Sequence, residues 1–286
     1  MALSVPVAQL LIDGQLESAL MYCERALTIA PDTREAHYNR NVILRRLGRQ
    51  SEAIDCYWDL LQANATIVRP SVQTELDRSA SRSSSIKMEM ETVEPLVVSV
   101  VCVKWGNKYG ADYVNKLYRG VRRHLDARRV CMRFVCLTDD ATGIDSSTEM
   151  TCIGLEGHWR GWWNKVELFA PSVASRLERH CVYIDLDTVI VGDLTELLLS
   201  LARQLETTLV LMLKTDSMAN EQRLGGYNSS VIAWLNEPTN QSDLNGLSAV
   251  YELLVEHFNV ITAYIYKLDH WFEVHTNATL SFFLFL

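Results

Sequence analysis

The chain has 286 residues, a length that allows one large domain or two unequal ones. Its composition is 48% hydrophobic and 22% charged, as in soluble globular proteins. The formal net charge of −8, without a dense run of Lys and Arg, argues against a nucleic-acid-binding surface.

Seven cysteines are scattered along the chain, and no two of them form a C-x-x-C pair. The sequence therefore indicates neither a zinc knuckle nor a disulfide framework, and free thiols in a reducing compartment fit best. The N-terminus lacks the basic region and apolar stretch of a signal peptide. The apolar segment Leu280–Leu286 is shorter than the about 20 residues that span a bilayer. These features predict a soluble, cytoplasmic protein.

The first 65 residues contain an internal repeat. The segment Gly14–Ala19 recurs as Gly48–Ala53, an offset of 34 residues, and Cys23 aligns with Tyr57 at the same offset. This period, with Pro31 closing the first unit, resembles the tetratricopeptide repeat (TPR). The resemblance covers residues 1–65 and implies a small all-α segment that binds a protein partner. Because two repeats rarely suffice for independent stability, we expect stabilising contacts with the rest of the chain or with that partner.

Residues 66–94 differ in composition from the segments on either side. Ser79–Ser85 and Lys87–Glu91 are polar, low in aromatic residues and without a hydrophobic period. This composition predicts a flexible linker, so that residues 95–286 form a second domain.

The second domain opens with alternating strand and helix patterns. Leu96–Val103 is an apolar, β-branched run that predicts a buried strand, and the Gly- and aromatic-rich turn Lys104–Gly110 follows it. Hydrophobic spacing predicts an amphipathic helix over Ala111–Leu125. A second strand is predicted at Arg133–Leu137, and it ends in Thr138–Asp140.

The apolar run Cys181–Val191 carries two carboxylates, Asp185 and Asp187. The run indicates a strand buried on both faces, in which side chains at i and i+2 point the same way and can share one hard cation. The alternative is a pair of polar residues at a strand end that cap a turn. Because ligands of open α/β sheets bind outside the carboxyl ends of the strands, we expect Lys104–Tyr109 and Thr138–Asp140 on the same side as the aspartates.

The segment His158–Lys165 holds three tryptophans followed by a lysine, and a short helix, Val166–Phe169, comes before Pro171. One interpretation is an aromatic helix start that packs on the sheet, with Lys165 reaching out to water. The functional interpretation places Lys165 on an anionic ligand, a diphosphate or a sugar hydroxyl.

The remaining segments continue the α/β pattern. We predict a helix at Asp193–Leu205, a strand at Thr208–Leu213, a turn at Gly225–Ser230 that brings Asn228 and Ser229 close to a ligand, a strand at Val231–Trp234, and helices at Leu247–Phe258 and Ile261–Trp271.

Taken in this order, the motifs of residues 96–275 resemble glycosyltransferases of the GT-A fold, nearest to the glycogenin-like group. The motifs that carry the resemblance are Lys104–Tyr109, Thr138–Asp140, Gly161–Lys165, the Asp185-Leu-Asp187 "DxD" and Gly226–Ser230. The implied fold is α/β, a Rossmann-like mixed sheet flanked by helices, preceded by the all-α TPR segment.

The resemblance also implies a function, the metal-dependent transfer of a sugar from a UDP-sugar to a sugar, lipid or protein acceptor. Asp185, Asp187 and His270 would bind Mn²⁺ or Mg²⁺, and the metal would neutralise charge on the leaving diphosphate. Asp187 and Lys165 would be the catalytic residues. The implied substrate-binding residues are Lys104, Trp105, Gly106, Tyr109, Thr138, Asp139, Trp163, Asn164, Lys165, Asn228 and Ser229.

Two other functions fit parts of the sequence. Tyr183–Val189 also resembles the first motif of haloacid-dehalogenase-type phosphatases, with Asp185 as nucleophile and Lys214 in the place of that group's lysine, although here two strands precede the motif. The apolar stub Phe282–Leu286 suggests a truncated C-terminus that lacks part of an acceptor wall. The second alternative is therefore an inactive, repeat-bearing adaptor that binds a nucleotide-sugar without turnover.

Overall fold

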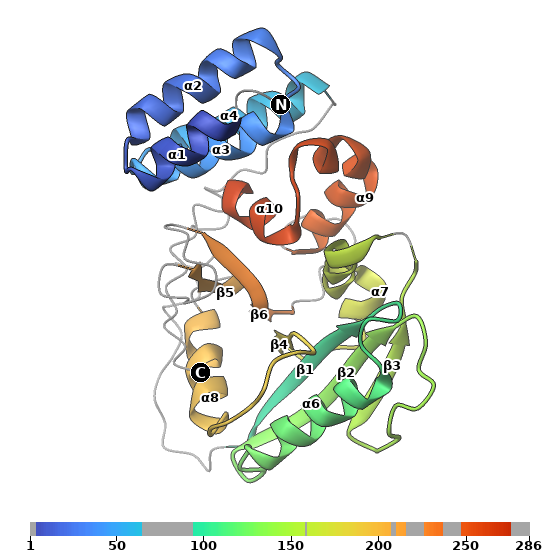
Figure 1. The fold of residues 1–286 in the computed structure, drawn as a ribbon. Helices are drawn as coiled ribbons and strands as arrows, with labels where there is room; N and C mark the ends of the chain where they lie inside the picture. Colours follow the sequence, from blue (N-terminus) through green and yellow to red (C-terminus); the bar gives the residue numbers. More distant parts are fainter. Residues whose placement is uncertain are drawn as a thin grey trace. The chain divides into compact units, whose positions relative to one another are not determined.

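A computed structural model describes residues 4–64, 94–157, 159–206, 210–215, 226–236 and 247–275 (Figure 1). Residues 66–93 of the predicted linker and the apolar stub Phe282–Leu286 lie outside the described residues. The described chain divides into two compact units. The helical unit comprises residues 4–64, 214–215, 226–227 and 253–275, and the α/β unit comprises residues 94–157, 159–206, 210–213, 228–236 and 247–252.

The helical unit begins with four helices, α1 (Ser4–Ile12), α2 (Leu16–Ile29), α3 (Arg34–Arg46) and α4 (Gln50–Asn64). The predicted 34-residue offset recurs in the backbone. Gly14 and Gly48 have positive φ angles of 70° and 74°, which an L side chain rarely adopts. The Gln15 N–H donates to the Leu10 carbonyl at 2.8 Å, and the Arg49 N–H donates to the Leu44 carbonyl at 2.9 Å. The repeat is thus a repeat of structure as well as of sequence.

The repeated positions also share their place in the core. Ala19 and Ala53 are fully buried, and their small side chains let neighbouring helices approach closely. Cys23 and Tyr57, which align at the same offset, are both buried as well.

A C-terminal helix, α10 (Leu268–His275), belongs to the same unit as the repeat and packs on α4. The helix before it, α9 (Leu247–Tyr264), is kinked at His257, and its residues from 253 on belong to this unit. Two helices were predicted here, and two are present, with the break between them at residues 265–267 and not after Phe258. The His270 ring meets the rings of Tyr38 and Tyr57 edge-on, with centroids 4.9 and 5.0 Å away. A later part of the chain therefore packs on the repeat, which is one of the two alternatives expected from the sequence.

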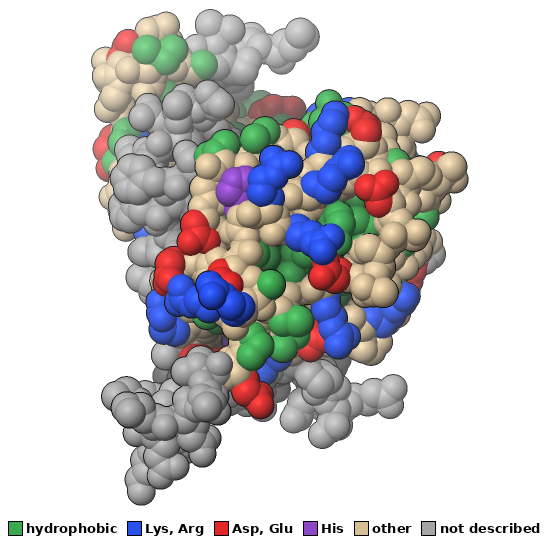
Figure 2. All heavy atoms as spheres, turned by 90° about the horizontal axis from the view of Figure 1, so that it is seen from below, with side chains coloured by type: hydrophobic (Ala, Val, Ile, Leu, Met, Phe, Trp, Pro, Cys, Tyr) green, Lys and Arg blue, Asp and Glu red, His purple; other side chains and the backbone are tan. Residues whose placement is uncertain are grey.

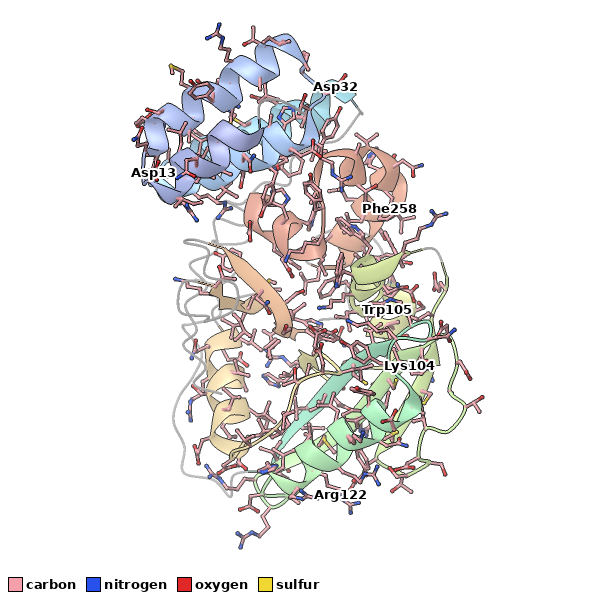
Figure 3. The ribbon with its side chains drawn as sticks, viewed as in Figure 1. Asp13, Asp32, Lys104, Trp105, Arg122 and Phe258 are labelled. Atoms are coloured by element: carbon pink, nitrogen blue, oxygen red, sulfur yellow. The ribbon has the colours of Figure 1, made fainter. Side chains whose placement is uncertain are left out.

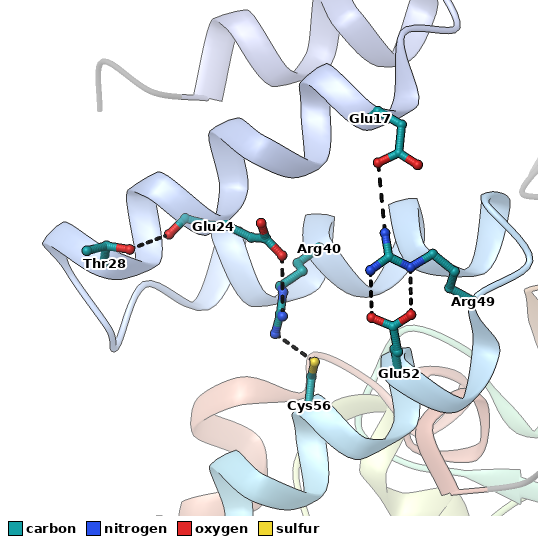
Figure 4. A network of polar contacts seen from close by, with 7 residues as sticks. All are labelled: Glu17, Glu24, Thr28, Arg40, Arg49, Glu52 and Cys56. Carbon is teal, nitrogen blue, oxygen red and sulfur yellow. Dashed lines mark hydrogen bonds and ion pairs between the residues drawn. The ribbon is translucent and has the colours of Figure 1, made fainter.

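Ion pairs on the surface of the helical unit join its helices (Figure 4). The Arg49 guanidinium lies 2.6 Å from the Glu52 carboxylate and 3.8 Å from that of Glu17, and Arg40 lies 3.5 Å from Glu24. These side chains are mostly well exposed, so water screens each pair and its contribution to stability is small.

The α/β unit is built around a six-stranded mixed sheet with the order β3-β2-β1-β4-β6-β5. Strands β1, β2, β3 and β4 run parallel, and β6 is antiparallel to β4. The strands are β1 (Leu96–Lys104), β2 (Val130–Thr138), β3 (Met150–Gly154), β4 (His180–Ile184), β5 (Val210–Lys214) and β6 (Tyr227–Leu235). The predicted α/β class with a mixed sheet flanked by helices is confirmed.

The helical elements of this unit are α6 (Ala111–Arg123), the 3₁₀ helix η1 (Gly161–Phe169), α7 (Pro171–Ala174) and α8 (Thr195–Leu205). Helix α6 buries Val114, Leu117, Tyr118 and Val121, an amphipathic spacing that packs one face inward. On the face of the molecule shown in Figure 2, Lys and Arg side chains are interspersed with Asp and Glu. None of the described helices combines the length and the apolar character that crossing a membrane requires.

Three local predictions were wrong. The run Cys181–Val191 is not one buried strand, because β4 ends at Ile184 and Val189 and Val191 are 73% and 72% exposed. Gly225–Ser230 was predicted as a turn, but β6 already starts at Tyr227. The helix expected only from Val166 is a 3₁₀ helix that begins at Gly161.

Candidate functional site

Polar side chains meet at the carboxyl ends of β1, β2 and β4, which share one edge because these strands are parallel. The Lys104 ammonium, at the end of β1, donates to the Asp140 carbonyl at 3.0 Å. The Tyr109 hydroxyl donates to the Asp187 carboxylate at 2.6 Å. Figure 3 labels Lys104 and Trp105 at this end of the sheet. The predicted convergence of the three segments is confirmed.

The corner between β1 and β2 is fixed by its own hydrogen bonds. The Gly106 N–H donates to the Asp139 carboxylate at 2.7 Å, and the Lys104 ammonium lies 3.7 Å from the same carboxylate. Lys104 and Thr138 are buried, whereas Asp139 is exposed and Trp105 is half-buried. The Thr138 hydroxyl donates to the Asp140 carbonyl at 2.9 Å, a hydrogen bond that holds the backbone just after β2. The corner thus presents an exposed carboxylate and an aromatic ring on a rigid support.

Asp185 is held by groups from three elements. The Lys165 ammonium, from η1, lies 2.9 Å from Oδ1 and 3.1 Å from Oδ2 of Asp185, and the Tyr183 hydroxyl donates to Oδ1. Burial, and then the Asp185 charge, raises the pKa of Tyr183 well above its usual value, so the phenol stays a donor. The Asp185 N–H donates to the Ser230 carbonyl of β6 at 2.8 Å.

Lys165 is a buried cation. Its side chain is 4% exposed, and besides Asp185 it donates to the Ser229 hydroxyl at 3.0 Å. The interpretation in which Lys165 reaches out to water is therefore wrong. An ammonium group is expensive to bury unless it is paired, and the Asp185 carboxylate supplies the pair.

Asp187 is the exposed member of the pair, two residues further on. Both aspartates lie in a turn after β4, in which the Thr188 N–H donates to the Asp185 carbonyl at 3.1 Å. The sequence had suggested that the pleat of a strand aligns these two side chains. Their arrangement comes instead from a turn, which was the alternative. The hydroxyl of Tyr109 donates to Asp187, and the ring of Tyr109 also contacts Lys108. The Lys108 ammonium lies 4.6 Å from the centroid of that ring. The closeness of the Lys108 ammonium to the Tyr109 hydroxyl, and then to Asp187 and Asp185, raises the pKa of Lys108.

Helix η1 places its aromatic residues differently from the prediction. Trp163 and Asn164, both predicted to bind substrate, are 6% and 5% exposed, and the Asn164 amide donates to the Gly161 carbonyl at 2.8 Å. Trp162 is 63% exposed. Sequence reasoning singled out Trp163 and missed Trp162. In a 3₁₀ helix, side chains three residues apart lie on the same side. The spacing of Trp162 and Lys165 could therefore have drawn attention to Trp162 if the helix type had been known.

The other predicted site residues fall in two places. Ser229 contacts Lys165, and the Asn228 side-chain carbonyl accepts the Ser230 N–H at 2.8 Å within β6. His270 is fully buried in the helical unit, where its ring meets those of Tyr38 and Tyr57.

Asp185 and Asp187 are suitable oxygen ligands for a hard cation. The described residues contain no group of three or more His, Cys, Asp and Glu side chains placed to hold a metal by themselves. Mg²⁺ and related ions, however, commonly use one or two protein carboxylates and take further ligands from substrate phosphates. The exposed Asp187 and the partly exposed Asp185 fit that second arrangement.

No protein-family model and no curated protein shows a significant match to the chain. Solved structures that this chain is similar to include WbbM, described as a bifunctional glycosyltransferase in its apo form, with 16% identity and a TM-score of 0.41 over 65% of this chain and 38% of its own. Another is mouse xyloside xylosyltransferase 1, also apo, with 11% identity and a TM-score of 0.38 over 64% of this chain and 81% of its own. This chain therefore spans well under half of the length of WbbM.

Proposed function

We propose that the α/β unit transfers a sugar from a nucleotide-sugar, with a UDP-sugar as donor and Mn²⁺ or Mg²⁺ as cofactor, to a sugar, lipid or protein acceptor. The observation that carries the proposal is the cluster at the carboxyl end of β4, where Asp185, Asp187 and the buried Lys165 lie beside the β1–β2 corner. The order of motifs that resembles GT-A glycosyltransferases supports the same conclusion.

Each member of the cluster has a distinct task in this proposal. Asp187, with Asp185, would hold the metal ion through carboxylate oxygens. When bound, the metal neutralises negative charge on the leaving diphosphate. Lys165 fixes Asp185 by contacting both of its oxygens, and Tyr109 orients Asp187 through a 2.6 Å hydrogen bond.

The two sides of the cluster suit the two parts of the donor. On the β1 side, Trp105 and the exposed Asp139 would contact the base and ribose, while Lys104, Gly106 and Thr138 hold the corner rigid. On the β6 side, Asn228 and Ser229 would face the donor sugar. Trp163 and Asn164 support this side from the interior, because both are buried.

A phosphatase is the second candidate, and one observation favours it. Asp185, the residue that would act as nucleophile, is paired with a buried lysine that could also neutralise a bound phosphate. That lysine is Lys165, whereas the sequence had suggested Lys214. Hydrolysis of p-nitrophenyl phosphate that is lost in Asp185→Asn would establish this alternative.

The repeat supports a separate proposal for the helical unit, namely that it serves as a TPR-type docking element for a protein partner. In that case, any catalysis would belong to the α/β unit alone. If the α/β unit is inactive, the whole chain would act as an adaptor that binds a nucleotide-sugar without turnover.

The deciding experiment is calorimetric titration with UDP, with and without Mn²⁺. We expect UDP to bind in the presence of Mn²⁺, and we expect Asp187→Ala to weaken that binding at least about tenfold, the loss that corresponds to about 1.4 kcal/mol. Asp145→Ala is a matched control, because Asp145 is also an exposed carboxylate and its nearest cation, Arg119, is 3.9 Å away.

The outcomes separate the candidates. Metal-dependent binding that vanishes only in Asp187→Ala supports the donor site, and release of UDP from a UDP-sugar then tests turnover. Binding without turnover supports the adaptor. If neither UDP nor GDP binds, with or without Mn²⁺, the proposed transfer is wrong.

A further inference from the structure

Tyr183 is a buried tyrosine whose hydroxyl donates to one of the two aspartates. It lies in β4, two residues before Asp185, and is fully buried. Its backbone pairs with Val101 of β1 on one side and with Ile232 of β6 on the other. Because a ring packed in the middle of a sheet has little room to move, its hydroxyl stays at a defined place.

Tyr183 contacts both partners of the buried ion pair. Its hydroxyl donates to Oδ1 of Asp185, and the Lys165 ammonium lies over its ring, 5.1 Å from the centroid. The phenol therefore holds the carboxylate with its polar end and attracts the cation with the face of its ring. Lys165 and Asp185 both have tasks in the proposed function, whereas this phenol has none.

The Lys165 ammonium lies between the two oxygens of Asp185. Its nitrogen is 2.9 Å from Oδ1 and 3.1 Å from Oδ2, which is the position that a cation chelated by both oxygens would take. Lys165 also donates to the Ser229 hydroxyl at 3.0 Å and to the Ser229 carbonyl at 3.2 Å. These contacts use the three N–H donors of an ammonium group, so Lys165 acts on a ligand through Asp185.

The acceptor sites of the Asp185 carboxylate are mostly occupied. An ionised carboxylate has about four lone-pair sites, two on each oxygen. Lys165 takes one site on each oxygen, and Tyr183 takes the second site on Oδ1. Among the described contacts, one site on Oδ2 remains, and the Asp185 side chain is 22% exposed. Asp185 can therefore offer a cation one oxygen, in one fixed direction.

We propose that Tyr183 is a positioning residue that keeps Asp185 a one-oxygen ligand of fixed direction, so that the site selects Mg²⁺ over Ca²⁺. The proposal rests on the proposed function. Mg²⁺ demands near-ideal octahedral geometry and takes one or two carboxylates together with substrate phosphates, whereas Ca²⁺ accepts more oxygens in a flexible geometry. Groups that orient a metal ligand without touching the metal commonly change the metal affinity by about tenfold or more.

The test measures the affinity of the full-length protein for UDP by calorimetry, with Mg²⁺, with Ca²⁺ and without metal. We expect the wild type to bind UDP more tightly with Mg²⁺ than with Ca²⁺. Tyr183→Phe keeps the ring, removes the hydroxyl and frees the second site on Oδ1. We expect this variant to lose about tenfold in UDP affinity with Mg²⁺, and far less with Ca²⁺ or without metal.

Tyr118→Phe is a matched control in the same unit. Tyr118 is also a buried tyrosine, 4% exposed, and its hydroxyl donates to the Glu149 carboxylate at 2.9 Å. This variant should leave the UDP affinity unchanged with either cation, so it separates the loss of a buried hydroxyl from the loss of positioning. Replacing Tyr183 by 4-aminophenylalanine, whose amino group can also donate, should restore part of the affinity with Mg²⁺.

A double-mutant cycle tests whether Tyr183 acts through Asp185. With Mg²⁺, Tyr183→Phe should weaken UDP binding much less in the Asp185→Asn background than in the wild type, because the carboxylate that it positions is already absent. Additive losses would show that the hydroxyl acts by another route, and the inference would be wrong.

The remaining outcomes also overturn the inference. If Tyr183→Phe binds UDP with Mg²⁺ as tightly as the wild type does, or if the wild type does not distinguish Mg²⁺ from Ca²⁺, the positioning role is wrong and the donor site stands. If Tyr183→Phe weakens UDP binding equally with and without metal, or does not fold, the hydroxyl serves the fold. If the wild type fails to bind UDP with both Mg²⁺ and Mn²⁺, the proposed function fails first, and this inference fails with it.

Discussion

The two units bury polar groups in different ways. In the α/β unit, the Lys165 ammonium is 4% exposed and is paired with Asp185, whose side chain is 22% exposed, at an edge of the sheet. In the helical unit, the fully buried His270 meets the ring edges of Tyr38 and Tyr57. A buried charge beside a partly exposed carboxylate is poised to interact with a charged ligand. An imidazole enclosed by aromatic rings is part of the packing.

The same contrast holds for the ion pairs of the two units. The Arg49 and Glu52 side chains of the helical unit are 39% and 51% exposed, against 4% for Lys165. Water screens the first pair, so its loss has little effect, whereas removing one partner of the second leaves a charge with poor solvation. Location, and not the chemistry of the pair, therefore decides how much each one contributes.

Replacing Lys165 tests this contrast with the largest expected effect. In Lys165→Met the Asp185 carboxylate keeps its burial and loses its cation, so we expect a loss of about 3 kcal/mol in the free energy of unfolding, the lower end for a broken buried pair because Asp185 retains some access to water. Urea denaturation followed by circular dichroism measures the change.

The control is Lys116→Met, which removes an exposed partner of Asp112 and should lower the free energy of unfolding far less than Lys165→Met does. The double variant Lys165→Met/Asp185→Asn should recover part of the loss, because the uncompensated charge is then gone. Equal losses in the Lys165 and Lys116 variants would contradict the distinction between the two kinds of pair.

The sequence predicted the α/β class and the helical repeat better than the details of the site. The 34-residue offset is a long-range periodicity, and it is retained as positive φ angles at Gly14 and Gly48. The convergence of β1, β2 and β4 follows from parallel topology alone, and it too was predicted. These features depend on pattern over many residues.

The local errors arose where tertiary contacts end an element. The continuous apolar run did not reveal that β4 stops at Ile184, since the turn that follows is closed by a hydrogen bond to the Asp185 carbonyl. Trp162 and Trp163 are neighbours in the sequence, and the 3₁₀ geometry of η1, which was not predicted, sets which of the two rings reaches the core. The pairing of Lys165 with Asp185 spans 20 positions and had no sequence signal.

The repeat of the helical unit yields a matched pair of variants with an intermediate effect. A Cβ at Gly14 or Gly48 would meet no atom within 4 Å, so Gly14→Ala and Gly48→Ala should cost only the strain of a positive φ, about 1 kcal/mol each. Urea denaturation should give similar losses for the two, since they occupy equivalent places. Gly192→Ala, whose Cβ is also unobstructed but whose φ is not positive, should change stability little.

A difference of more than about 1 kcal/mol between Gly14→Ala and Gly48→Ala would show that the two halves of the repeat are not equivalent. A clear loss in Gly192→Ala would mean that the cost does not come from backbone conformation.

A smaller effect is expected from pH, and it should appear in both units. Burial lowers the pKa of His37 in the helical unit and of His180 in the α/β unit from the usual 6.5. As the pH falls below 6.5, the unfolded chain takes up protons that the folded chain resists, so the free energy of unfolding falls until the lowered folded pKa is passed. Urea denaturation at about pH 7.5 and about pH 6 should show the loss, and His37→Asn and His180→Asn should each reduce it. Higher stability at the lower pH would reverse the sign of this argument.

The smallest effect is expected for His270→Phe, which should leave the affinity for the nucleotide unchanged. A phenyl ring can keep the edge contacts with Tyr38 and Tyr57, centroids 4.9 and 5.0 Å from the imidazole, but it cannot bind a metal. If His270 belongs to the packing, calorimetry should give the same Mn²⁺-dependent affinity for UDP as in the wild type, while Asp187→Ala loses it. If His270→Phe folds with wild-type stability and still loses Mn²⁺-dependent binding, His270 is the third metal ligand that the sequence suggested. The separation of the two units into a packing core and a reacting edge would then be wrong.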